Sequence, residues 1–137
     1  MEKTKTLSYD WEFGHEELFI EVNSYANNNR LYIGLYHMED GQPELFGDLT
    51  VNLPCDDVKA NEAYISDFSV KSKLQFIRQH KLGRVVSRRE DYRYQKVAFH
   101  LDRLAEFDKN GVDEFRRIHN IPKDKKPKVK RKMERER

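Results

Sequence analysis

A chain of 137 residues with a net charge of +2 has the length of one domain and can bury a single hydrophobic core. Its hydrophobic content of 37% and aromatic content of 12% exclude a fully disordered chain, while 36% charged residues predict a very polar surface. One cysteine excludes an intramolecular disulfide, and no apolar run approaches the roughly 20 residues of a membrane-spanning helix. The N-terminal residues resemble no signal peptide, so we expect a soluble cytoplasmic protein without a membrane partner.

Alternating apolar and polar residues predict an antiparallel meander in the first half of the chain. A strand over residues 15–25 follows a short lead-in or first strand at residues 4–8, which residues 6–13 could also continue. Residues 30–53 contain two alternating runs joined by residues 39–43, where Asp40-Gly41 suits the tight turn of a central β-hairpin.

The two faces of this meander differ in composition. One face is expected to form the core with Leu18, Ile20, Val22, Leu31, Ile33, Leu35, Leu49 and Val51. The opposite face is expected to carry Phe19, Tyr32, Tyr36 and Phe46, a set too aromatic to be fully solvated.

The second half of the chain is predicted to contain one main helix. Residues 54–63 form a connecting loop, and residues 64–68 suit either a short strand or a helix entry. The main helix covers residues 70–82 and ends at Gly83. Either Ser69 or Ser72 can cap its start, and Ser72 with Gln75 fits a capping box.

A loop or extended arm is predicted for residues 84–93, and a further strand for residues 94–101. A short helix over residues 103–107, a break at Asn110-Gly111 and a last short helix complete the expected domain, residues 1–121. Residues 122–137 form a basic tail that we expect to be disordered. The predicted fold class is therefore α+β: an antiparallel sheet of about four strands with a central hairpin, one main helix packed on it, and short C-terminal helices.

Charge is strongly segregated along the chain. Residues 6–67 contain thirteen acidic and two basic residues, a net charge of −11. Residues 68–103 carry a net charge of +7, and residues 122–137 a further +6. Such a charge asymmetry is informative about the binding partners of a protein and says little about its fold.

The acidic half is a candidate surface for a partner protein, because regularly spaced carboxylates can imitate the phosphates of a nucleic acid. Its candidate residues are Glu39, Asp40, Glu44, Asp48, Asp56 and Asp57. The simpler alternative is a solvated acidic surface.

The basic segment over residues 71–96 is a candidate nucleic-acid or partner surface, since it has no acid from Phe68 to Arg89. Its candidate residues are Lys71, Lys73, Arg78, Lys81, Arg84, Arg88, Arg89 and Arg93. Tyr92 and Tyr94 could stack on unpaired bases. Alternatively, the basic helix lies across the acidic sheet and neutralises it.

Catalytic and metal signatures are missing from the sequence. The five histidines are scattered without ligand spacing, and Asp56 and Asp57 beside Cys55 would raise the thiol pKa and oppose a nucleophilic role. We therefore predict no catalytic residue, no metal and no cofactor, and an unrecognised small enzyme is the least favoured interpretation.

Several strings resemble the domain-of-unknown-function family 4313 along roughly residues 24–115. They are SYANNNRLYIGLY, DGQPELFGDLTVNLP, NEAYISDFS, KLQFIRQHKLGRVV, VAFHLDRLAEFD and GVDEF. The resemblance implies an accessory protein of bacterial conjugative transposons, plasmids and related mobile elements, with no assigned activity and no catalytic residues to transfer.

The leading hypothesis is a non-enzymatic binding protein of a mobile element that engages a host or element-encoded protein. In its specific form, the acidic half inhibits a host defence nuclease. The alternative is a nucleic-acid-binding accessory protein that acts through the basic segment and the tail. The sequence predicts no particular oligomeric state.

Overall fold

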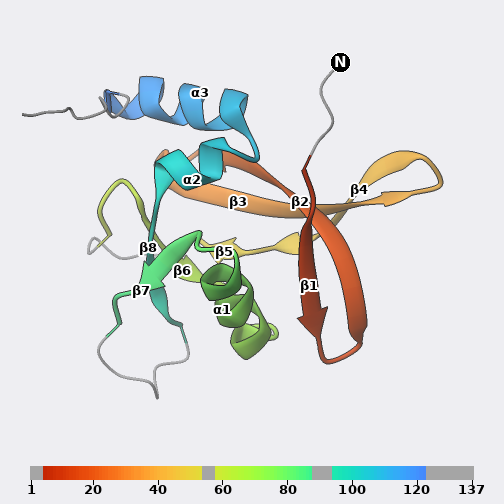
Figure 1. Ribbon diagram of the computed structural model, residues 1–137. Coiled ribbons are helices and arrows are strands. Elements are labelled where there is room, and N and C mark those ends of the chain that lie inside the picture. The colour runs from red at the N-terminus through yellow and green to blue at the C-terminus, as the bar shows by residue number, and fades with distance from the viewer. Residues whose placement is uncertain (1–4, 54–57, 88–93, 123–137) are drawn as a thin grey trace, which may run out of the picture.

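The computed structural model describes residues 5–53, 58–87 and 94–122 (Figure 1). Within these residues the chain forms eight strands and three helices, and the strands make two four-stranded antiparallel sheets. The predicted α+β class is confirmed. The predicted tail lies outside the described residues except for Pro122, so its disorder stays a prediction.

The first sheet contains the predicted central hairpin. Its strands, in order across the sheet, are β1 (Leu7–Trp11), β2 (Gly14–Ser24), β3 (Leu31–Glu39) and β4 (Gln42–Asp48). Asp40 and Gly41 form the hairpin turn with positive φ angles of 54° and 80°, as the Asp-Gly pair predicts. Strand β1 begins within residues 4–8 and continues to Trp11, which agrees with the longer of the two predicted extents.

The second sheet was not predicted as a separate unit. Its strands, in order across the sheet, are β5 (Thr50–Val51), β6 (Glu62–Ile65), β8 (Lys96–Phe99) and β7 (Gly83–Val85). The single alternating run expected to end at Leu53 is divided, because the chain leaves the first sheet after Asp48 and pairs Thr50 with Ile65. Strand β7 also occupies part of the predicted arm, since Arg84 pairs with Ala98.

A bulge in the hairpin corrects the expected position of Phe46. Leu35 lies opposite Gly47 and Tyr36 opposite Leu45, so Phe46 is an extra residue without a partner in β3. Its ring turns toward the core side, 5.9 Å from Tyr9 between ring centroids. The neighbouring Leu45 is 53% exposed.

Three helices cover the sheets, namely α1 (Val70–Gln79), α2 (Leu101–Ala105) and α3 (Lys109–His119). Helix α1 lies between β1 and the second sheet, whereas α3 contacts β2 and carries α2 beside it (Figure 1). Of the two predicted cap residues, Ser69 is the N-cap. The capping box of Ser72 and Gln75 does not form, and the hydroxyls of Ser69 and Ser72 both donate to Glu12. Helix α1 also ends three residues earlier than predicted.

One core joins both sheets and all three helices. The predicted core residues of the first sheet are buried, except that Val51 is half-buried. Phe76 and Ile77 of α1, Leu104 of α2, and Val112 and Phe115 of α3 complete this core. Full burial of each large apolar side chain contributes about 1.5–3 kcal/mol to the free energy of unfolding.

Asp108 fixes α3 to the first sheet. Its Oδ2 accepts a hydrogen bond from the Val22 N–H at 2.8 Å, and its Oδ1 accepts one from the Gly111 N–H at 3.1 Å. Gly111 therefore lies in the first turn of α3 and is not the predicted helix break. A β-carbon at Gly111 would lie 2.5 Å from the carbonyl oxygen of Val22.

We expect Gly111→Ala to lower the free energy of unfolding by about 1–3 kcal/mol, because the new methyl group displaces Asp108 from both donors. Gly47→Ala is the control, since a β-carbon there meets nothing within 4 Å. Its effect should stay within about 0.5 kcal/mol. Urea denaturation measures both variants, and equal losses would contradict the role of Asp108.

Candidate partner-binding surfaces

The side of the first sheet that faces away from the core is an acidic and aromatic surface, called here the outer face. Because paired residues of antiparallel strands point to the same side, the strand register defines its members. They are Ser8, Asp10, His15, Glu17, Phe19, Glu21, Asn23, Tyr32, Gly34, Tyr36, Met38, Pro43, Leu45 and Asp48. The outer face thus carries four carboxylates from three strands and neither lysine nor arginine.

Aromatic rings lie flat along the outer face between these carboxylates. Phe19 and Tyr36 stack with 5.9 Å between ring centroids. The Tyr32 ring covers Gly34, where a β-carbon would lie 2.6 Å from the Tyr32 hydroxyl, so this glycine makes room for the ring. The Tyr32 hydroxyl donates to Asp48 Oδ1 at 2.7 Å.

Both tyrosines remain protonated donors at neutral pH. Burial and then the Asp48 carboxylate raise the pKa of Tyr32, whereas the hydrogen bond to Glu21 is the main cause that raises the pKa of Tyr36. Asp48 therefore holds the Tyr32 ring in place, and Glu21 holds the Tyr36 ring in place.

Apolar side chains project from the same face at the hairpin. Met38 is 55% exposed, and Leu45 diagonally opposite is 53% exposed. Tyr and Met are enriched in the buried centres of protein interfaces, and exposed carboxylates at the rim favour a basic partner. The outer face has the composition of such an interface.

His37 joins two carboxylates on the other side of the hairpin. Its Nδ1 lies 3.2 Å from Glu16 Oε1, and its Nε2 lies 3.4 Å from Glu44 Oε1. Since both ring nitrogens face acceptors, the arrangement favours the protonated imidazole, and the hydrogen bond with Glu16 is the main cause that raises the pKa of His37.

Among the described residues, His37 and its neighbours are the one group whose ligand atoms could hold a metal ion. Ligand atoms of His37, Glu39 and Glu44 all lie within 4.8 Å of one another. A cation there would compete with the proton on His37. Sequence reasoning missed His37, although its pairing with Glu44 across the hairpin turn could have indicated it.

The predicted acidic residues are divided among several places. Asp48 lies on the outer face, Glu39 and Glu44 lie beside His37, and Asp40 lies in the hairpin turn. Asp56 and Asp57 lie outside the described residues. Asp10, Glu17 and Glu21 were not predicted, although the alternation Glu17-Phe19-Glu21 in β2 could have indicated them.

Four of the predicted basic residues form an exposed set, namely Lys71, Arg78, Lys81 and Arg84. Within the described part of the chain, their side chains form no ion pair. Lys71 and Arg78 border a shallow groove along α1, and Arg84 lies on the edge strand β7. These cations therefore do not neutralise the acidic sheet.

Lys73 is the exception among the described basic candidates. Lys73 is 5% exposed, and its Nζ lies 5.6 Å from the centroid of the Phe68 ring. Burial lowers the pKa of Lys73, while Asp48, Asp67 and Glu12 oppose this effect. Lys73 belongs to the interior, and Arg88, Arg89 and Arg93 lie outside the described residues.

Comparison with known proteins agrees with the resemblance seen in the sequence. The family model "Domain of unknown function (DUF4313)" matches residues 19–119. The chain belongs to this family. No curated protein and no solved structure matches the chain. The match runs from Phe19 in β2 to the end of α3, so it includes Glu21 and Asp48 of the outer face of this DUF4313 chain but not Asp10 and Glu17. No described helix is long and apolar enough to cross a membrane.

We expect Glu16→Gln to lower the pKa of His37 toward the ordinary imidazole value of about 6.5. His15, whose ring nitrogens face Asp10 and Glu17 at 2.6 Å, is the internal control and should keep its raised pKa. Imidazole NMR signals followed against pH measure both groups.

The raised pKa of His37 also determines how the stability of the folded chain changes with pH. Because folding raises the pKa of His37, its stabilising contribution is present below about pH 6.5 and is lost as the pH rises through the raised value. A shift of both histidines by the same amount in Glu16→Gln would indicate a general charge effect and contradict the specific contact.

Proposed function

We propose that this DUF4313 chain is a non-enzymatic binding protein of a mobile genetic element, and that its outer face engages a basic protein of the host or of the element. The observation that supports this proposal is the composition of one sheet face. Four carboxylates surround a row of aromatic rings and the exposed side chains of Met38 and Leu45. Complementary charge provides orientation and fast association, while the apolar centre provides contact area.

A nuclease of a host defence system is the partner class that we favour. The nucleic-acid groove of a nuclease is basic, and its walls are spaced to receive regular negative charge. Glu17 and Glu21 lie four residues apart on the same side of β2, so their positions along the strand are about 13 Å apart. The association with mobile elements rests on the resemblance of the sequence to its family.

Charge reversal on the outer face tests this proposal. We expect Glu17→Lys/Glu21→Lys to weaken capture of basic host proteins by the immobilised chain at least about tenfold, since like charges then meet across the interface. The matched control is Glu106→Lys/Glu114→Lys, which makes the same change in net charge at exposed positions of the C-terminal helical region. Quantitative mass spectrometry of the captured proteins compares the three chains. Equal losses in both variants would contradict a surface-specific role.

Binding of nucleic acid through the basic segment is the second candidate function. Its support is the exposure of Lys71, Arg78, Lys81 and Arg84 without ion-pair partners among the described residues. Cations that are already hydrated and unpaired can contact phosphates and release counterions without breaking an existing ion pair. The basic tail would add to the same effect.

We expect Lys71→Ala/Arg78→Ala/Arg84→Ala to reduce the salt dependence of duplex DNA binding, because each phosphate contact accounts for about 0.9 of the logarithmic slope. Stability should change by no more than about 1 kcal/mol per exposed position. Lys59→Ala/Lys109→Ala/Arg117→Ala removes as many exposed cations elsewhere and serves as the control. Fluorescence anisotropy at several salt concentrations gives the slopes, and identical slopes for the two variants would exclude a specific basic surface.

A further inference from the structure

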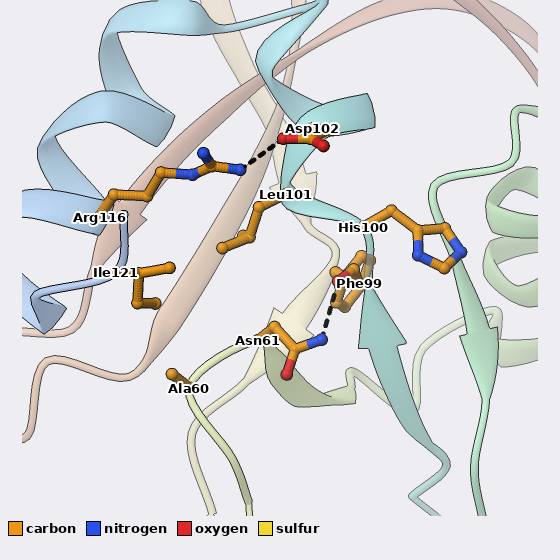
Figure 2. Close-up of a pocket in the computed structure, with 8 residues that line it drawn as sticks. All are labelled: Ala60, Asn61, Phe99, His100, Leu101, Asp102, Arg116 and Ile121. Atoms are coloured by element: carbon orange, nitrogen blue, oxygen red, sulfur yellow. Dashed lines mark hydrogen bonds and ion pairs between the residues drawn. The ribbon is translucent and has the colours of Figure 1, made fainter. Parts of the chain in front are cut away.

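The charged and amide groups of the pocket beside α2 and α3 bond to the protein itself. Figure 2 shows Arg116 joined to Asp102, and the two bonded atoms, Nη2 and Oδ1, lie 2.6 Å apart. In the same pocket Asn61 Nδ2 donates to the Phe99 carbonyl oxygen at 3.0 Å. These contacts need no bound molecule, in contrast to those of the histidine in the β3–β4 hairpin.

This hairpin brings one histidine and two glutamates to the same side of the first sheet. His37 lies opposite Glu44 in the strand register, and Glu39 follows His37 by two residues, so the three side chains point the same way. Their ligand atoms lie within 4.8 Å of one another. One imidazole nitrogen and two carboxylate oxygens suit zinc, whereas magnesium and calcium favour oxygen ligands alone.

The separation of His37 and Glu44 fits a shared zinc ion better than a hydrogen bond. His37 Nε2 lies 3.4 Å from Glu44 Oε1, beyond the usual hydrogen-bond range of about 2.7–3.2 Å. Two tetrahedral ligands that are each about 2.0–2.1 Å from zinc lie about 3.3–3.4 Å from one another. The two atoms are therefore already separated as they would be around zinc.

His15 also has two carboxylate neighbours, but its geometry does not suit a metal ion. Its two ring nitrogens lie 2.6 Å from carboxylate oxygens of Asp10 and Glu17. Neighbouring ligands are about 3 Å apart even around a small octahedral ion, so these pairs are too close to share one. His15 is a hydrogen-bonded imidazole and serves as an internal control for His37.

Glu16 and Phe46 hold the His37 ring in the orientation that zinc needs. An ionised carboxylate only accepts hydrogen bonds, so the 3.2 Å contact with Glu16 Oε1 favours a proton on Nδ1 and leaves the Nε2 lone pair for a metal. A carboxylate behind a ligating histidine fixes its tautomer in the same way in zinc sites generally. The Phe46 ring packs edge-on against the imidazole at 5.5 Å between centroids, and the His37 side chain is only 20% exposed.

We propose that His37 Nε2, Glu39 and Glu44 bind one zinc ion in the β3–β4 hairpin. Three protein ligands leave the fourth tetrahedral position to water. The sequence predicts no metal because its histidines lack ligand spacing along the chain, whereas this site forms across a hairpin turn. Its ligands point away from the outer face, so zinc binding is independent of the proposed partner protein.

Titration of the labelled full chain with zinc chloride tests this site directly, in mildly alkaline buffer so that protons do not compete for His37. We expect the imidazole NMR signals of His37 to shift and to saturate at one equivalent of zinc, while those of His15 stay unchanged. Magnesium chloride and calcium chloride should leave His37 unchanged even at tenfold higher concentration. Unchanged His37 signals with zinc, an equal response of His15, or an equal response to magnesium would each overturn the proposal.

Glu44→Gln removes one ligand at an exposed position and hardly changes the shape of the side chain. We expect it to raise the Kd for zinc at least about tenfold, because even the loss of a group behind a ligand costs about 10–100-fold in metal affinity. The matched control is Glu17→Gln, the same exchange at an exposed position beside His15. Its Kd should stay within about twofold of the unchanged chain. Equal effects of the two substitutions, or an unchanged Kd in Glu44→Gln, would also overturn the proposal.

Discussion

Residues Leu49 and Thr50 join the two sheets, and the rest of the structure depends on this junction. The Leu49 N–H donates to the Ile33 carbonyl oxygen in the first sheet at 2.9 Å, while the Leu49 carbonyl accepts from the Ser66 N–H beside the second at 3.1 Å. The buried Thr50 hydroxyl accepts from the Ile33 N–H and shares a further hydrogen bond with the Tyr25 hydroxyl. The backbone and hydroxyl groups that take part in these bonds are therefore hydrogen-bonded inside the core.

The junction also explains how charge segregation in the sequence becomes segregation in space. It holds the second sheet and α1 against the core side of the first sheet, so the outer face stays open to solvent. Asp10, Glu17, Glu21 and Asp48 lie on the first sheet, and the exposed cations lie on α1, on β7 and in the turn between them. Lys73 alone among the described basic candidates enters the acidic side, where burial and not ion pairing dominates its pKa. Two surfaces of opposite charge are thus available to different partners.

The pattern of apolar and polar residues predicted the parts of the fold that depend on residues close together in the sequence. The alternation in residues 15–53 identified the hairpin and most of the core, because period-two alternation directly reflects burial of one sheet face. It could not reveal the bulge at Phe46 or the passage of the chain to a second sheet, since both depend on packing against Tyr9 and on pairing with β6. Likewise, the hydroxyls of Ser69 and Ser72 donate to Glu12, some 60 residues away in the sequence, and do not cap α1.

The candidate sites were less predictable than the fold, because a face is defined by strand register. Asp10, Glu21 and Asp48 lie on three different strands and share the outer face only through the pairing of neighbouring strands. The most direct test maps amide and side-chain NMR shifts of the labelled chain with the basic protein captured from the host. The proposal predicts shifts centred on Phe19, Tyr32 and Tyr36 of β2 and β3. Shifts confined to α1 and β7, with the outer face unchanged, would contradict it.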